Sequence, residues 1–201
     1  MKYYCKQIPV VMIILIFTLH VPNGNTLDYQ NKEIRYYQSN DIGMKIKDIL
    51  EKDAPSYEFV LTVEKSVDLE ERKLYSDNEI IKQWKISFYN NNVIREKREY
   101  DGNSLINLTY YDRRSRLTEE HFYSENRFYR KTIYSYREDQ KLDQTKTFDS
   151  KGLLIYQEFY EFNKQGMLRR VKRLWNDGTV HISSFKYGKG RLIEDVFSTN
   201  D

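Results

Sequence analysis

An aromatic residue returns about every twelve positions along the C-terminal two thirds of this chain, and each time it opens a short turn. An aliphatic or aromatic residue follows five or six positions later, as Leu117 follows Tyr111 and Leu153 follows Phe148. The aromatic anchors are Tyr75, Tyr89, Tyr100, Tyr111, Tyr123, Tyr136, Phe148, Phe162, Trp175 and Tyr187. Self-similarity at a fixed period indicates one supersecondary unit copied along an array.

The segments between the anchors predict strands joined by tight reversals. Clusters such as Tyr100-Asp101-Gly102-Asn103 and Trp175-Asn176-Asp177-Gly178 combine Asp, Asn and Gly, which adopt turn conformations at little cost. Reversals this short force neighbouring strands to be antiparallel, and none leaves room for a crossover helix. We therefore predict that residues 73–201 form a mainly β domain, an antiparallel meander of about ten to twelve strands.

The faces of these strands are not divided into an apolar and a polar side. In residues 117–123, for example, Leu117, Glu119 and His121 alternate with Thr118, Glu120 and Phe122. A largely exposed sheet stabilised by cross-strand pairs is one solution. A closed or partly closed β-barrel with a partly polar interior is the alternative that this pattern leaves open.

The segment from residue 25 to 72 lacks the twelve-residue pattern, and we interpret it as an N-terminal cap. Ser39-Asn40-Asp41 resembles a helix N-cap, and apolar residues then recur at helical spacing until Pro55. This predicts a short amphipathic helix from about Asp41 to Lys52. A first strand is expected over Tyr57 to Val63, where β-branched and aromatic residues dominate.

Residues 1–24 have the layout of a signal peptide. Lys2 and Lys6 precede an apolar run from Ile8 to Leu19, which is too short to span a bilayer as a helix. The sequence predicts export to the periplasm, the surface or the medium, with an uncleaved N-terminal anchor as the alternative. Cys5, the sole cysteine, lies before the apolar run, so no disulfide is expected in the mature chain.

The charge balance argues against a nucleic-acid partner. The chain has 33 basic and 30 acidic residues, and removal of Lys2 and Lys6 with the signal leaves 31 against 30, a net charge of +1. A protein that neutralises many phosphates normally carries a clear basic excess. Eighteen tyrosines and ten phenylalanines also argue against disorder, because disordered segments are poor in aromatic residues.

The turn sequences resemble those of known repeats. Tyr111-Asp112-Arg113-Arg114-Ser115-Arg116-Leu117 and Phe148-Asp149-Ser150-Lys151-Gly152-Leu153-Leu154 are similar to the aromatic-Asp-x-x-Gly-x-Leu core of YD-type repeats. They also resemble the MORN-like hairpin repeats of exported bacterial proteins, over about residues 74–197. The resemblance implies a β-hairpin array used as a scaffold or binding surface, without a catalytic residue.

No catalytic motif, cofactor or metal site is expected from the residues. His121 and His181 stand alone in strands, without a second ligand at a suitable spacing. Phosphate-binding loops and nucleophile-elbow sequences are absent from the sequence. We therefore expect a protein that is not an enzyme.

The densest group of cations marks the candidate binding patch. Alternation in residues 169–175 places Arg169, Arg173 and Trp175 on one face and Arg170 and Lys172 on the other. The first group could bind an anionic glycan, a lipid headgroup or another envelope protein, because a tryptophan adds cation–π contacts to charge attraction. The competing interpretation is that these cations pair with Glu158, Glu161 and other acids on neighbouring strands.

Two further interpretations concern the aromatic anchors and the protein as a whole. The anchors either brace the hairpin turns of their own repeat or form a stacking platform. For the whole chain we expect an exported, non-enzymatic β-repeat protein acting as an envelope scaffold or binding surface. The alternative is a small β-barrel that binds a ligand or houses a catalytic pocket.

Overall fold

The computed structural model describes residues 33–188 and 191–200, and it places their strands in one antiparallel sheet. Residues 1–24, to which the signal peptide was assigned, lie outside this range. A single 3₁₀ turn, η1 (Glu51–Ser56), is the one helical element described. The strands are β1 (Glu33–Ser39), β2 (Lys45–Ile49), β3 (Phe59–Lys65), β4 (Leu69–Ser76), β5 (Glu79–Phe88), β6 (Ile94–Asp101), β7 (Ser104–Tyr111), β8 (Leu117–Ser124), β9 (Arg127–Tyr136), β10 (Leu142–Asp149), β11 (Leu154–Phe162), β12 (Leu168–Trp175), β13 (Val180–Gly188) and β14 (Arg191–Asn200).

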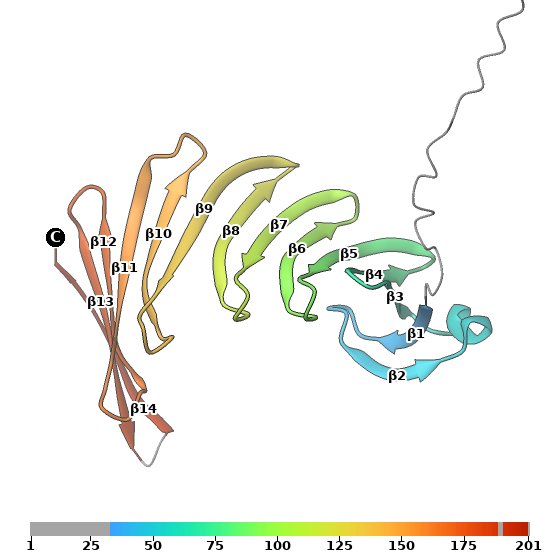
Figure 1. Cartoon of the computed structure of the whole chain (residues 1–201), viewed down its shortest axis with the longest axis horizontal. Helices are drawn as coiled ribbons and strands as arrows, with labels where there is room; N and C mark the ends of the chain where they lie inside the picture. The colour runs from blue at the N-terminus through green and yellow to red at the C-terminus, as the bar shows by residue number, and fades with distance from the viewer. Residues whose placement is uncertain (1–32, 189–190, 201) are drawn as a thin grey trace, which may run out of the picture. The chain divides into compact units, whose positions relative to one another are not determined.

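From β3 to β14 every strand pairs with its neighbours in the chain, and β1 lies between β3 and β2 (Figure 1). The predicted mainly β, antiparallel meander is thus confirmed. The repeat region contributes eleven strands, β4 to β14, and the segment before it adds three more, which gives a 14-stranded sheet.

The sheet is open, so the barrel alternative is wrong. Its two edges are β2 and β14, which do not pair with each other. Closure into a barrel would require that pairing together with a consistent strand tilt and register shift.

The prediction of a helix from Asp41 to Lys52 is also wrong. That segment contains a turn, the strand β2 and the start of η1. The Asn40 side chain accepts hydrogen bonds from the backbone N–H groups of Ile42 and Met44, at 3.3 and 2.8 Å, and so closes a turn instead of capping a helix. Gly43 has a φ of 83°, which ends any right-handed helical turn. The strand expected over Tyr57 to Val63 is present as β3.

Six hairpin turns of the repeat region share one backbone geometry. In each, the N–H of the first residue donates to the carbonyl of the fifth, at 2.8 or 2.9 Å, and the N–H of the fourth donates back to the carbonyl of the first. The fourth residue always has a positive φ: Asn92, Ser115, Gln140, Gly152, Gly166 and Gly178. This is the five-residue hairpin turn with a left-handed position that glycine fills without strain.

The acidic or amide residue after several anchors caps these turns. The Oδ1 atom of Asp149 accepts hydrogen bonds from the N–H groups of Lys151 and Leu153, both at 2.9 Å. Asp112 and Asn163 make the same pair of contacts in their own turns. The aromatic-Asp pattern in the sequence is therefore a local device that satisfies the backbone of the reversal.

The apolar core lies at the N-terminal end of the sheet. It consists of the buried side chains of Tyr37, Leu61, Val63, Leu74, Trp84 and Ile86. The turn between β1 and β2 packs against it, because a Cβ atom at Gly43 would lie 2.7 Å from Cη2 of Trp84. Glycine is therefore required at this position for two reasons: a side chain would clash with Trp84, and the backbone has a positive φ.

Farther along the sheet the buried residues are mainly threonines. Thr147 is fully buried and its hydroxyl lies 3.0 Å from that of Thr132. Thr145 is 2% exposed and lies one strand from Glu158. The central strands thus bury hydrogen-bonded polar groups where most sheets bury an apolar face.

Candidate functional site

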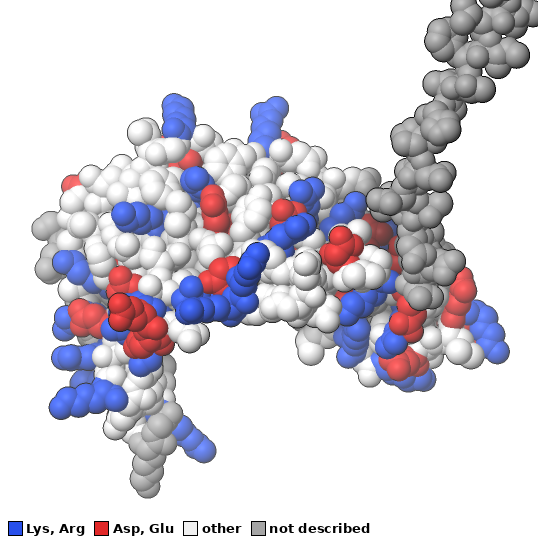
Figure 2. Space-filling view, viewed as in Figure 1, with Lys and Arg blue, Asp and Glu red and all other residues white. Residues whose placement is uncertain are grey.

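Cations and acids are interspersed over the surface, as the face drawn in Figure 2 shows. Many of them form ion pairs between neighbouring strands or along one strand, such as Arg98 with Glu96 at 2.7 Å and Lys73 with Glu71 at 2.9 Å. Within the described residues no helix is long and apolar enough to cross a membrane.

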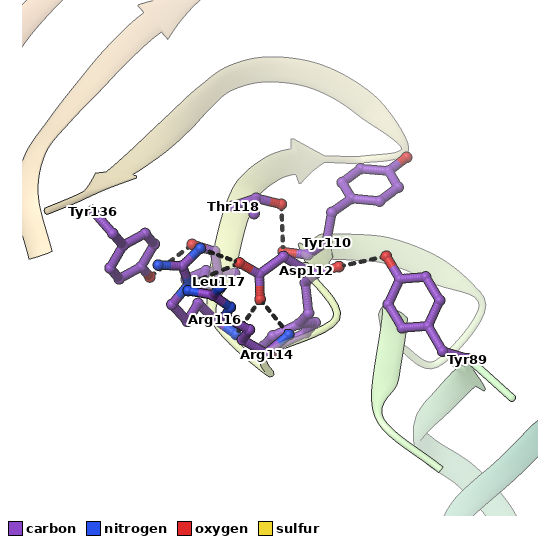
Figure 3. A network of polar contacts seen from close by, with 9 residues as sticks. Tyr89, Tyr110, Asp112, Arg114, Arg116, Leu117, Thr118 and Tyr136 are labelled. Atoms are coloured by element: carbon purple, nitrogen blue, oxygen red, sulfur yellow. Dashed lines mark hydrogen bonds and ion pairs between the residues drawn. The ribbon is translucent and has the colours of Figure 1, made fainter. Parts of the chain in front are cut away.

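Two of the aromatic anchors, Tyr89 and Tyr136, brace a turn two repeats away (Figure 3). The hydroxyl of Tyr89 donates to the carbonyl of Tyr111, at 2.9 Å, and that of Tyr136 donates to the carbonyl of Leu117, at 2.7 Å. The Arg116 guanidinium lies 4.8 Å from the centre of the Tyr136 ring. These contacts join turns that are two repeats apart in the sequence, so these two anchors stabilise the array.

In the predicted patch, the structure brings Arg173 and Trp175 together. The Arg173 guanidinium lies 5.6 Å from the centre of the Trp175 ring and 4.6 Å from that of Tyr156. Its Nε and Nη2 atoms donate to Oε1 of Glu158, at 2.9 and 2.7 Å. Arg173 is therefore held in one orientation by an acid and two rings.

Glu158 is the centre of this arrangement. Its other oxygen accepts hydrogen bonds from the hydroxyl groups of Tyr160, at 2.7 Å, and Thr145, at 3.0 Å. Burial acts to raise the pKa of Glu158, but the hydrogen bonds from Tyr160 and Arg173 outweigh it, and the net pKa is lowered. Burial, together with the bond to Glu158, raises the pKa of Tyr160, so this hydroxyl stays protonated.

The other cations of β12 are held less tightly. Arg170 lies 3.5 Å from Glu161 across the strand pair, and both side chains are at least 40% exposed. No ion pair within the described residues involves Arg169 or Lys172. Pairing with Glu158 and Glu161, the competing interpretation, thus accounts for Arg173 and Arg170 but not for the other two.

An aromatic row extends this patch across four strands. Ring centres lie 5.0 Å apart for Tyr156 and Trp175, 5.8 Å for Trp175 and His181, and 5.4 Å for His181 and Phe197. Tyr156 and Trp175 are tilted by 60°, and the two contacts of His181, at 68° and 71°, have the edge-to-face geometry that aromatic pairs prefer. Sequence reasoning missed Tyr156, His181 and Phe197 because only the strand register places them beside Trp175.

His121 and the acids near it form hydrogen bonds and ion pairs with neighbouring side chains. His121 lies 2.6 Å from Glu119, which also pairs with Lys131 at 3.3 Å. Glu120 accepts a hydrogen bond from Tyr134 at 2.9 Å, on the opposite face of the sheet. Among the described residues, no group of three or more His, Cys, Asp or Glu side chains is arranged to hold a metal ion.

Comparisons with known proteins add little to this geometry. No protein-family model and no curated protein matches the sequence. One similar solved structure is "Crystal structure of GtfA/B complex bound to UDP and GlcNAc", with 13% identity and a TM-score of 0.28 over 62% of this chain. The match spans 24% of that chain, and at this TM-score it carries no argument about fold or function.

Proposed function

We propose that this chain is an exported, non-enzymatic β-repeat protein that acts as a scaffold or binding surface of the cell envelope. The observation that carries the proposal is the open sheet, whose edges β2 and β14 do not pair. An open sheet of this length offers extended, solvated faces, and repeat arrays commonly use such faces to bind partners.

The patch around β12 is the part of this surface best suited to a partner. It combines a fixed arginine with an aromatic row. Alternation along the sequence assigned Arg169 to the same face, and in the structure Arg169 is the unpaired residue at the register shift between β11 and β12. Rigid aromatic rings give large contact area at low entropic cost, and a guanidinium adds directional hydrogen bonds. Its partner is an anionic surface: another envelope protein, a glycan or lipid headgroups.

Binding should depend on the face of β12 that carries Trp175. We expect Arg169→Ser/Arg173→Ser to weaken binding of an anionic polysaccharide, or of anionic vesicles, by about tenfold or more. Arg170→Ser/Lys172→Ser removes the same charge from the other face and should weaken binding by less than about threefold. Affinity measured at low salt for wild type and both variants, with each of the two ligands, checks this, and equal losses in both variants would indicate diffuse charge without a binding face.

Export is tested separately from binding. We expect the native protein to begin near Asn25 and to be found outside the cytoplasm, because the apolar run has the length and flanking charge of a signal peptide. N-terminal sequencing of protein from cell fractions measures both properties. A soluble cytoplasmic protein that retains Met1 would refute the proposal, whereas a membrane-held protein with Met1 would show an uncleaved anchor.

A further inference from the structure

A cavity at the N-terminal end of the sheet is lined by acidic and tyrosine side chains, whereas β12 is rich in cations. Its volume is about 380 Å³, within the range of small-molecule sites. Its walls are η1, the adjoining strands β1, β3 and β4, and the turn that joins β4 to β5. It is lined by Tyr36, Glu51, Ala54, Pro55, Tyr57, Glu58, Val60, Thr62, Tyr75, Asp77 and Asn78.

The lining contains three tyrosines and three carboxylates but no lysine or arginine. None of the ion pairs within the described residues involves Glu51, Glu58 or Asp77. Acids elsewhere on the sheet, such as Glu71 and Glu158, have cationic partners. The lining therefore carries three acids that form no ion pair within the described part of the chain.

The tyrosines provide a second and independent feature. The neighbouring Glu51 carboxylate, together with burial, raises the pKa of Tyr36. The ammonium group of Lys47, which is not part of the lining, lies 3.5 Å from the hydroxyl of Tyr57 and 5.8 Å from the centre of its ring. The Tyr57 ring thus already accepts one alkylammonium group within this chain.

The arrangement of the acids argues against a metal ion as the ligand. Glu51, Glu58 and Asp77 do not form a group that could hold a metal ion together. Hard cations such as Ca²⁺ need several oxygen ligands gathered around one centre. Separate carboxylates in a tyrosine-lined cavity suit a longer ligand, with an ammonium group at each end and an apolar body between them.

We propose that this cavity binds an alkyl diamine, with Glu58 and Asp77 contacting its ammonium groups and Tyr36 and Tyr75 contacting its alkyl chain. The site is formed by η1, β1, β3, β4 and the turn after β4, and not by β12, so the inference does not depend on the proposed function. A failure of diamine binding would leave the proposal for the β12 patch untouched.

Two substitutions test the site with little risk to the fold. Asp77 has a φ of 51° in its turn, and asparagine accepts this left-handed conformation as readily as aspartate does. Glu58 is exposed, so Glu58→Gln removes only its charge. The matched control is Glu138→Gln/Asp143→Asn, which neutralises two exposed acids outside the cavity lining.

The experiment is isothermal titration calorimetry of the full chain with 1,5-diaminopentane and with its neutral analogue 1,5-pentanediol. We expect the diamine to bind and the diol not to bind. Glu58→Gln/Asp77→Asn should weaken diamine binding by at least about tenfold, and the control variant should change it by less than about twofold. Tyr75→Ala should also weaken binding by several-fold, because it removes the apolar ring surface that contacts the alkyl chain.

Three outcomes would overturn the inference. Absence of diamine binding at millimolar concentration and low salt would show that the cavity is not a cation site. Equal losses in the cavity variant and the control would show diffuse attraction to an acidic surface. Comparable binding of the diol would show a site selective for hydroxyl groups instead of ammonium groups.

Discussion

Replacing Leu74 by alanine is expected to lower the free energy of unfolding by about 2–5 kcal/mol. Leu74 is completely buried, and it belongs to the apolar cluster in which Trp84 and Leu61 pack. The rest of the sheet buries mainly threonines, so no other described part of the chain can replace the lost contacts. Urea denaturation followed by tryptophan fluorescence measures the change, because Trp84 lies in the same cluster.

Leu153→Ala is the matched control, because Leu153 is 64% exposed. It should change the free energy of unfolding by less than about 0.5 kcal/mol. Hydrogen exchange would show whether the Leu74 variant destabilises all strands or only β1 to β5, since arrays of this kind can unfold in parts. Similar losses for the two variants would show that stability is spread along the sheet and not concentrated in the cluster.

The fold could be predicted from the sequence because its signals are local. Each turn is specified by a short set of residues, such as Asp149 and Gly152, whose hydrogen bonds and dihedral angles lie within the same five residues. Repetition of that set gives strand spacing, antiparallel order and mainly β content without knowledge of long-range contacts.

The helix prediction failed where two local signals compete. Asn40 serves equally well as a helix N-cap and as the first residue of a turn, and Ile42 and Ile46 fit a helical spacing. In the structure both isoleucines are at least 57% exposed, so no apolar face is buried that would favour a helix. Gly43 decides for the turn, because its close contact with Trp84 stabilises the folded-back hairpin.

The candidate sites could be predicted only in part, because register and curvature are not local. Alternation along β12 was enough to place Arg173 with Trp175, and the two side chains are in contact. The neighbours Tyr156 and His181 come from other strands, and the diamine cavity joins residues from η1 and several strands. No periodicity within one segment carries that information.

Glu158→Gln is expected to lower the free energy of unfolding by about 1–3 kcal/mol at pH 7. The amide keeps the shape of the side chain but loses the charge that Arg173, Tyr160 and Thr145 donate to. Thr145 is 2% exposed and has no water to replace a weakened acceptor, whereas Arg173 is 38% exposed and loses less. Glu161→Gln is the control, because that carboxylate is 50% exposed and its contact with Arg170 is long, so the change should be near zero.

The pH dependence of the Glu158→Gln effect separates a charge effect from a packing effect. The folded pKa of Glu158 lies below its ordinary value of 4.5, so its contribution is fully present above that pH and is lost as the pH falls through the folded pKa. Wild type should therefore progressively lose its advantage over the variant as the pH falls below the ordinary glutamate pKa, because glutamine does not titrate. Glu71, Glu119 and Asp112 also have lowered pKa values, but both proteins retain them and their contributions cancel in the difference. Thermal unfolding of both proteins from pH 7 to pH 3 measures this difference, and a gap that stays constant over that range would assign the loss to packing alone.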